Sequence, residues 1–447
     1  MSDSFKKVLA KGLPDYDAVQ ADTMLFGAWF GPEPTLERFQ ELKDCGFNTL
    51  FLLGDYTGWI GDESIEKALA LCDKLGIDAF VDGTRQEEKM RNLIAKYKQY
   101  ASFKGFNYDE PVIYDNTLTR SKGLVSLSSL AEEMVTAYPD LEFLVNLNPY
   151  TSLDFAWGTP AFTYEEYLEA TDKYINQHYK NKPARRWISV DDYPLFIDKK
   201  NNSCCLKKVW LKQLEYLAEE KRKSPLQLTS NFFIQSMAFG AVTEECSNDR
   251  LPTYEDLRLQ VYSVMAFGYD MISFFCYAMP LGFDEFTDAQ YGLLNKAGDK
   301  TQIYTDSKRI IGEVKKFSNT YMQFNSGWQG VLPVLGTNNP NGKNPAFDEL
   351  LNPITSVQAV KGLASVTSSE DIIIGVMQDK DGRPGYMLVN YNDSSLQLTS
   401  TVEFVLDGFD SARVYIQGEA REITAVKGKI TLELDIGEGV FVIPYNP

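Results

Sequence analysis

A chain of 447 residues is too long for one ordinary domain and long enough for a large barrel with a smaller second module. Its formal net charge of −18 argues against nucleic acid or an anionic membrane as a partner, because both require a basic surface. The single histidine, His178, and six scattered cysteines argue against a zinc site, and we expect neither a metal nor a cofactor.

The N-terminal residues contain no apolar core of a signal peptide, and no apolar run approaches the ~20 residues that span a bilayer. A cytoplasmic location is therefore expected, although a secreted chain without its signal would look the same.

Alternating strands and helices are predicted from about residue 24 to residue 277. Gly46 and Gly76 end the first two helices, as left-handed C-caps commonly do. Eight strand–helix units in roughly 250–300 residues match a (β/α)₈ TIM barrel. An open doubly wound sheet is the alternative, but no G-x-G-x-x-G follows any strand. The predicted strands cover 24–30, 47–53, 77–81, 103–108, 141–149, 187–190, 226–235 and 271–277.

A helix near 206–222 is predicted to precede the seventh strand, and the pattern changes after a last predicted helix near 305–322. Short strands separated by turns follow, which indicates an antiparallel β-sandwich. We expect two domains, residues 1–322 forming the barrel with a short N-terminal extension and residues 328–447 forming the sandwich. No long linker separates them, so the sandwich is expected to pack on the barrel. The predicted strands are 372–377, 386–391, 402–406, 414–417, 430–434 and 440–443.

Two predicted barrel strands end in paired carboxylates followed closely by proline. The fourth strand ends in Asp109-Glu110-Pro111, and the sixth ends in Asp191-Asp192-Tyr193-Pro194. Proline ends strand pairing because it lacks an N–H group. The C-terminal strand ends of such a barrel form the active site, so both clusters should lie at one rim. Paired carboxylates there suit acid/base chemistry, and cleavage of glycosidic bonds is its commonest use.

Strand alternation predicts which of these carboxylates face the barrel interior. Ser189 and Asp191 should point inward, because Ile188 and Val190 have the apolar character of outward positions. Asp191 is therefore the candidate base or nucleophile, and Asp192 is expected to form a cap or a salt bridge.

The same alternation places Asn107 and Asp109 inward on the fourth strand. Glu110 falls on the other phase, unless a bend before Pro111 brings it over the rim. A general acid must hold a proton near neutral pH, and neighbouring charge such as that of Asp109 favours this. Glu110 is the candidate general acid. The alternative is that Asp109-Glu110 is a solvated loop or a helix cap.

Polar and aromatic residues occupy other predicted strand ends. Amide and phenol groups suit recognition of hydroxyl groups, and aromatic rings suit stacking on sugars, although each residue alone could be ordinary loop chemistry. The expected substrate-binding residues are Trp29, Asp55, Asp109, Asn146, Asn148, Tyr193, Gln235 and Tyr277.

Four segments, 105–111, 144–149, 188–194 and 268–275, occur in the order of barrel strand ends. They resemble glycoside hydrolase-like (β/α)₈-barrel proteins of bacterial type, similar in plan to the clan A retaining glycosidases and often carrying a C-terminal β-sandwich. The resemblance implies that Glu110 is the acid/base. That clan usually has asparagine where this chain has Asp109. It also has a nucleophilic glutamate where this chain has Gln235, whose amide cannot be that nucleophile.

The expected function is hydrolysis of O-glycosidic bonds in an unidentified oligo- or polysaccharide. Either Asp191 supplies the second carboxylate, or the mechanism is inverting or substrate-assisted. The alternative is an inactive glycan-binding protein on the same scaffold. A carbon–carbon lyase or isomerase would need a Schiff-base lysine or metal ligands, and neither is evident. Strands four and six should be second neighbours with Cα atoms about 10 Å apart, which favours the wider, inverting geometry for Glu110 and Asp191.

Overall fold

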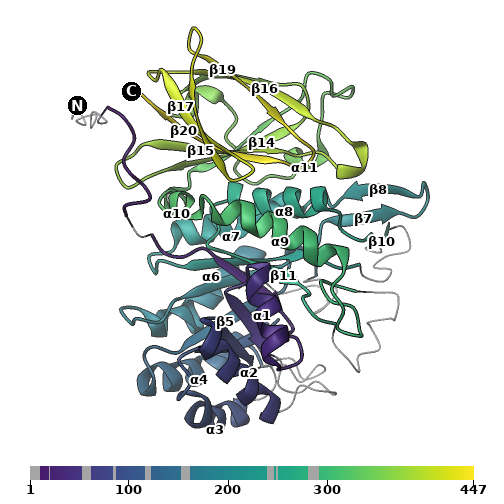
Figure 1. The fold of residues 1–447 in the computed structure, drawn as a ribbon. Helices are drawn as coiled ribbons and strands as arrows, with labels where there is room; N and C mark the ends of the chain where they lie inside the picture. Colours follow the sequence, from purple (N-terminus) through teal and green to yellow (C-terminus); the bar gives the residue numbers. More distant parts are fainter. Residues whose placement is uncertain are drawn as a thin grey trace, which may run out of the picture.

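A computed structural model of the chain describes residues 11–19, 21–52, 62–83, 87–115, 122–152, 162–238, 246–247, 250–279 and 291–447. Eight parallel strands close into a barrel in the order β1-β11-β9-β6-β5-β4-β3-β2, which confirms the predicted (β/α)₈ architecture (Figure 1). The barrel strands are β1 (Leu25–Trp29), β2 (Thr49–Leu52), β3 (Asp78–Asp82), β4 (Phe103–Asp109), β5 (Glu142–Leu147), β6 (Trp187–Asp191), β9 (Thr229–Gln235) and β11 (Met271–Phe275).

Helices surround the barrel, and their ends follow the local sequence. Thr35 begins the first helix by accepting the Arg38 N–H, and Gly46 ends it with a left-handed φ of 113°. Thr253 and Asp256 form the capping box that starts α8. The helices are α1 (Leu36–Cys45), α2 (Asp62–Leu75), α3 (Glu87–Tyr97), α4 (Leu124–Ala137), α6 (Tyr164–Tyr174), α7 (Trp210–Lys223), α8 (Tyr254–Ala266), α9 (Gln302–Lys315) and α10 (Ser318–Tyr321).

Two predicted helices differ from those observed. The helix expected near 206–222 begins at Trp210, because the preceding residues pair as the hairpin β7 (Leu195–Asp198) and β8 (Ser203–Leu206). A short strand, β10 (Cys246–Ser247), adds to the other edge of β7. The helix expected over 305–322 is divided into α9 and α10, because Phe317 adopts a non-helical backbone between them.

The C-terminal region is the predicted antiparallel β-sandwich. A six-stranded sheet, ordered β12-β14-β15-β20-β17-β18, faces a three-stranded sheet, ordered β13-β16-β19, across an apolar core of their own. The sequence analysis did not find β12, β13 and β18. The strands are β12 (Gly330–Val334), β13 (Leu363–Ser368), β14 (Ile372–Gln378), β15 (Pro384–Asn390), β16 (Ser400–Leu406), β17 (Ser411–Ile416), β18 (Glu419–Thr424), β19 (Lys429–Leu434) and β20 (Gly439–Tyr445). We keep residues 1–322 and 328–447 as the proposed domains.

Helix α8 joins the two parts, since it packs between the barrel and the six-stranded sheet (Figure 1). Buried Arg258 on α8 lies 3.0 Å from buried Glu438 of the sandwich. Gly375 on β14 lies so close to the end of α8 that an added Cβ would stand 2.0 Å from the Ala266 carbonyl oxygen. The packing therefore leaves no room for a methyl group at this position.

Gly375→Ala is expected to destabilise the protein by about 3 kcal/mol, because backbone on both sides must shift to admit the methyl group. Thermal unfolding measures the effect. Gly312→Ala is the matched control, since its Cβ on α9 would meet nothing within 4 Å and alanine favours the helix. A Gly375→Ala protein as stable as the wild type would contradict the close packing.

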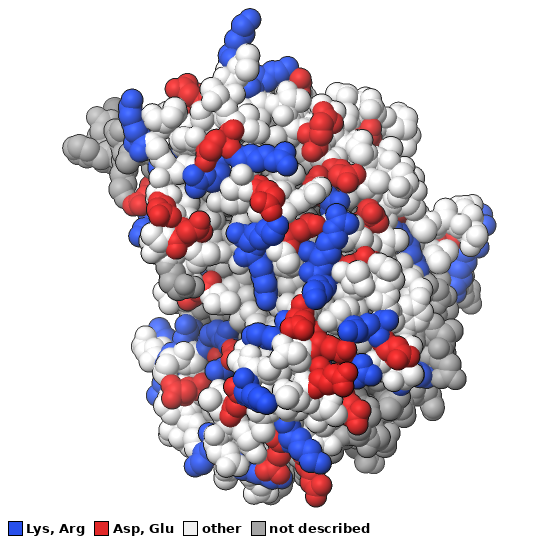
Figure 2. Space-filling view, in the orientation of Figure 1, with Lys and Arg blue, Asp and Glu red and all other residues white. Residues whose placement is uncertain are grey.

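Charged side chains of both signs share the surface of the protein. Acidic and basic side chains are interspersed over the face drawn in Figure 2, so the negative excess is not gathered there in one patch. Within the described ranges, no helix is both long and apolar enough to cross a membrane.

Candidate active site

Asn146 on β5 brings together the carboxylates at the ends of β4 and β6. Its Nδ2 atom donates to Asp109 Oδ1 at 3.1 Å and to Asp191 Oδ1 at 2.8 Å. Because the two hydrogen bonds share one donor atom, the Asp109 and Asp191 oxygens are at most about 6 Å apart. β5 lies between β4 and β6, so the predicted second-neighbour relation is confirmed. Asp109 and Asp191 both point into the barrel mouth, as the alternation predicts.

A chain of buried hydrogen bonds inside the barrel fixes the orientation of Asn146. Ser189 donates its hydroxyl to Asn146 Oδ1 at 2.8 Å, and Asn231 Nδ2 donates to Ser189 Oγ at 2.9 Å. Ser273 in turn donates to Asn231 Oδ1 at 2.7 Å. Because Asn146 Oδ1 is an acceptor in this chain, its NH₂ group must face the two carboxylates. Three neighbouring strands thus hold the amide that joins the acidic pair.

Asp191 has the proton affinity of an acid/base group. Burial raises its pKa to about 6, and the neighbouring charge of Asp192 acts in the same direction. Hydrogen bonds from Asn146 and from the Tyr193 hydroxyl oppose this shift without cancelling it. Asp191 therefore exchanges a proton close to neutral pH, as a carboxyl group in acid/base catalysis should.

Asp192 has a different environment from its neighbour and serves the fold. Its buried carboxylate forms an ion pair with partly exposed Lys207 and accepts the Tyr193 N–H at 3.1 Å. The Asp192 carbonyl accepts the indole N–H of Trp210 at 3.1 Å. The predicted salt bridge is confirmed, and the Asp192 carboxylate stabilises the segment that follows β6.

Glu110 follows β4 with a left-handed backbone, φ 46°. Its N–H donates to the Asn146 carbonyl at 2.8 Å, and its own carbonyl accepts from Asn148 Nδ2 at 3.3 Å. This is the bend before Pro111 that alternation alone leaves open, and the Glu110 side chain is exposed at the rim. Burial and the charge of three nearby carboxylates, Glu110 among them, raise the pKa of Tyr193. Glu110 thus belongs to the same acidic group as the inward pair.

Aromatic side chains pack together on the opposite side of the barrel, where Trp29, Phe51 and Phe233 are buried. The Trp29 ring lies 5.6 Å from Phe51 and 5.4 Å from Phe233, measured between centroids. Phe275 lies between Trp29, at 6.2 Å, and Tyr193, at 5.5 Å. The acidic group on β4–β6 is therefore opposed across the barrel by an aromatic cluster from β1, β2, β9 and β11, and within that cluster Phe275 is partly exposed.

Three of the predicted substrate-binding residues lie behind the mouth. Asn148 is buried with its amide on the Glu110 carbonyl. Tyr277 is fully buried, with its ring 5.5 Å from Phe47 and 6.4 Å from Tyr304 on the outer side of the barrel. Gln235, the third, is also fully buried. Asp55 lies outside the described residues.

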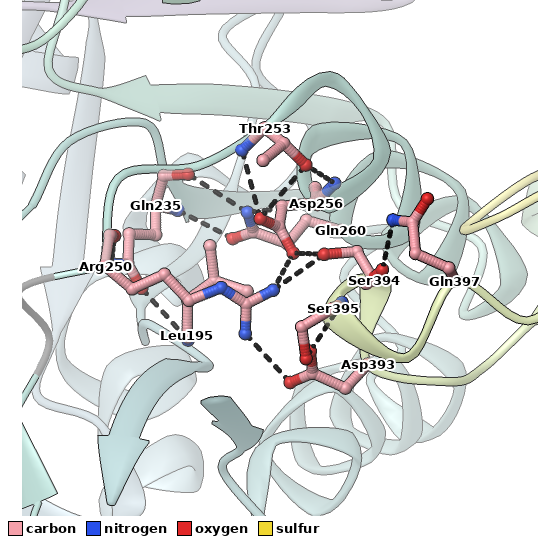
Figure 3. A network of polar contacts seen from close by, with 10 residues as sticks. All are labelled: Leu195, Gln235, Arg250, Thr253, Asp256, Gln260, Asp393, Ser394, Ser395 and Gln397. Carbon is pink, nitrogen blue, oxygen red and sulfur yellow. Dashed lines mark hydrogen bonds and ion pairs between the residues drawn. The ribbon is translucent and has the colours of Figure 1, made fainter. Parts of the chain in front are cut away.

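The Gln235 amide holds the segment after β6 (Figure 3). Its Oε1 atom accepts the Leu195 N–H at 3.0 Å, and its Nε2 atom donates to the carbonyls of Met237 at 3.1 Å and Arg250 at 3.5 Å. Because Leu195 follows Tyr193-Pro194, Gln235 anchors the chain that carries Tyr193. The amide thus has a structural task where the resemblance would place a nucleophile.

The sequence analysis did not identify Asn231 and Ser273 as part of the site. Their signal is the same as that of Ser189, a polar residue at an inward position of an otherwise apolar strand. Which of these polar residues meet is decided by the strand order, because β9 lies between β6 and β11.

No protein-family model matches the chain, and no curated protein matches its sequence. Among solved structures, a glycoside hydrolase family 5 protein from Bacteroides vulgatus shares 10% identity at a TM-score of 0.52, covering 95% of this chain and 89% of its own. A second glycoside hydrolase shares 10% identity at a TM-score of 0.51, covering 94% and 92%. A GH27 β-L-arabinopyranosidase from Geobacillus stearothermophilus shares 9% identity at a TM-score of 0.49, covering 97% of this chain and 98% of its own. The chain therefore shares its overall fold with the first two of these proteins.

Proposed function

We propose that this protein is a glycoside hydrolase that cleaves O-glycosidic bonds of an oligo- or polysaccharide with two carboxylates. The observation that carries the proposal is the Asn146 amide nitrogen, which donates to both Asp109 and Asp191. Two carboxyl groups facing one space across a buried amide suit a reaction that needs an acid and a base or nucleophile.

The environments of the two carboxyl groups support separate roles. Asp191, whose pKa burial raises to about 6, is the proposed general acid/base. Asp109 is the proposed nucleophile, because its oxygen lies within about 6 Å of Asp191. That separation supports retention, for which the carboxyl groups stand about 5–5.5 Å apart, over inversion at about 6.5–9.5 Å. Glu110, the acid implied by the resemblance, is the other candidate on β4.

Gln235, at the end of the seventh barrel strand β9, supports a catalytic pair at the ends of β4 and β6. Gln235 carries no charge, is fully buried, and uses its amide on three backbone groups. A nucleophile at that position is therefore not proposed. The exposed rim position of Glu110 suits contact with the leaving group, so its contribution must be measured separately from that of Asp109.

Parallel substitutions test this assignment. Asp109→Asn is expected to lower kcat/KM by about 10³-fold or more, whereas Glu110→Gln should lower it less than about tenfold. A panel of 4-nitrophenyl glycosides and oligosaccharides provides the assay, with circular dichroism to check folding. Azide should restore turnover to Asp109→Gly by replacing the lost nucleophile. A larger loss of kcat/KM in Glu110→Gln than in Asp109→Asn would assign the catalytic role at the end of β4 to Glu110. Full activity in both variants would reject a catalytic carboxylate at the end of β4.

A glycan-binding protein without turnover is the second candidate. The observation that favours it is Gln235, an amide where the resembling glycosidases have a catalytic glutamate. Binding of a sugar by wild-type protein, with no hydrolysis of any glycoside in the panel, would support this candidate.

A further inference from the structure

Asn107 on β4 is a buried amide without a hydrogen-bond partner. Its side chain is only 1% exposed, and neither Oδ1 nor Nδ2 has a partner among the described residues. It precedes Asp109 by two residues and so shares its inward face. The register pairs it with Asp82 on β3. Burying polar atoms unpaired is unfavourable, so the position calls for a partner from outside the chain.

The neighbouring strands differ from β4 in how their inward polar side chains are paired. The inward polar side chains of β5, β6, β9 and β11 form one continuous chain of hydrogen bonds. That chain ends at Asn146, whose NH₂ group turns to Asp109 and Asp191 rather than to Asn107. Asn107 therefore remains as an unused donor and acceptor one inward step below Asp109, buried beneath the acidic pair.

We propose that Asn107 is a substrate-binding residue that takes one hydroxyl group of the sugar bound at the acidic pair. An amide offers one donor group and one acceptor, and a hydroxyl group matches both. This inference rests on the proposed function and makes Asn107 a determinant of which sugar is bound. The competing occupant is a single water molecule.

Asn107→Leu tests the proposal, because leucine has a similar size and no hydrogen-bonding group. The probes are D-glucose, D-galactose, D-mannose, D-xylose, L-arabinose and L-fucose, measured by titration calorimetry and saturation-transfer NMR. The affinity for the sugar that the wild type binds should fall at least tenfold, while Tm stays the same or rises. The monodeoxy analogue that lacks the contacted hydroxyl should bind the wild type more weakly than the parent sugar does. It should bind the wild type and Asn107→Leu with equal affinity.

Tyr179→Phe is the matched control. It also removes a fully buried hydroxyl without a partner among the described residues, from a 3₁₀ turn (Asn176–Tyr179) of the outer layer. Sugar affinity should not change. If Asn107→Leu lowers Tm, Asn107→Ala, which only removes atoms, replaces it.

The outcomes separate this inference from the proposed function. Unchanged affinity in the Asn107 variants, with sugar still bound by the wild type, would assign the amide to a water molecule and leave the glycoside hydrolase proposal intact. If the wild type binds no sugar and cleaves no glycoside, the proposed function fails and this inference fails with it.

Discussion

Asp191→Asn is expected to lower turnover by about 10³-fold or more and to leave the folded protein more stable at neutral pH. The amide has the shape of the carboxyl group, so it can still accept from Asn146 Nδ2 and lie against the Tyr193 hydroxyl. It can neither donate a proton to a leaving group nor take one back. The gain in stability follows from the burial of Asp191, which raises its pKa by disfavouring the charged form that asparagine does not have.

The sign of the pH dependence follows from that raised pKa. The pKa of about 6 in the folded state lies above the ordinary aspartate pKa of 3.8, so between these pH values the folded state binds more protons than the unfolded state. Stability of the wild type therefore falls as pH rises through this range. Asp191→Asn should match the wild type near pH 4 and exceed it by about 1–3 kcal/mol above pH 7. Denaturant titrations at several pH values measure this difference. If Asp191 acts as the acid, kcat/KM of the wild type should also decline above about pH 6.

Asp192→Asn is the matched control at the adjacent position. It leaves Lys207 without its buried partner, so we expect a loss of stability of about 2 kcal/mol and a smaller loss of turnover. A protein that loses stability on Asp191→Asn and keeps its activity would contradict the assigned role of Asp191. Equal effects of the two substitutions on turnover would show that the segment, rather than the Asp191 carboxyl group, matters.

Local sequence patterns were sufficient to predict the barrel and the facing of its strands. Apolar residues at Ile188 and Val190 required Ser189 and Asp191 to point inward, and both do. Glycine after an apolar stripe ended α1 at Gly46. These predictions succeeded because they depend on residues close together in the chain.

Features that depend on distant residues could not be predicted in the same way. The bend at Glu110 is fixed by the Asn146 carbonyl and the Asn148 amide, which come from the next strand and the residues after it. The pairing of Asp109 with Asp191 also depends on the one amide between them. Gln235 looked like a ligand-binding residue from its place at a strand end, and only its contacts with Leu195 and Arg250 give it a structural task.

Arg250→Leu is expected to destabilise the protein by about 3–5 kcal/mol and to loosen the sandwich from the barrel. Arg250 is buried, and its guanidinium group forms ion pairs with Asp256 of α8 and, at 2.8 Å, with Asp393 of the sandwich (Figure 3). It also donates to Ser394 at 2.7 Å. Leucine would leave two buried carboxylates facing each other with no cation between them. Burial already raises the pKa of Asp256 although Arg250 opposes the shift, so that carboxyl group is poorly placed to remain charged alone.

The substitution should also reach the candidate active site. The Arg250 carbonyl accepts from Gln235, which holds Leu195 beside the rim, so we expect a lower kcat/KM in the fraction that stays folded. Arg413→Leu is the control, because its ion pair with Glu422 at 2.6 Å lies at the surface and should contribute less than about 1 kcal/mol. Adding Asp393→Asn to Arg250→Leu should recover part of the lost stability, since it removes one unpaired charge. If Arg250→Leu unfolds at the same denaturant concentration as Arg413→Leu, the buried network does not hold the two parts together, and the rim must be positioned by the barrel alone.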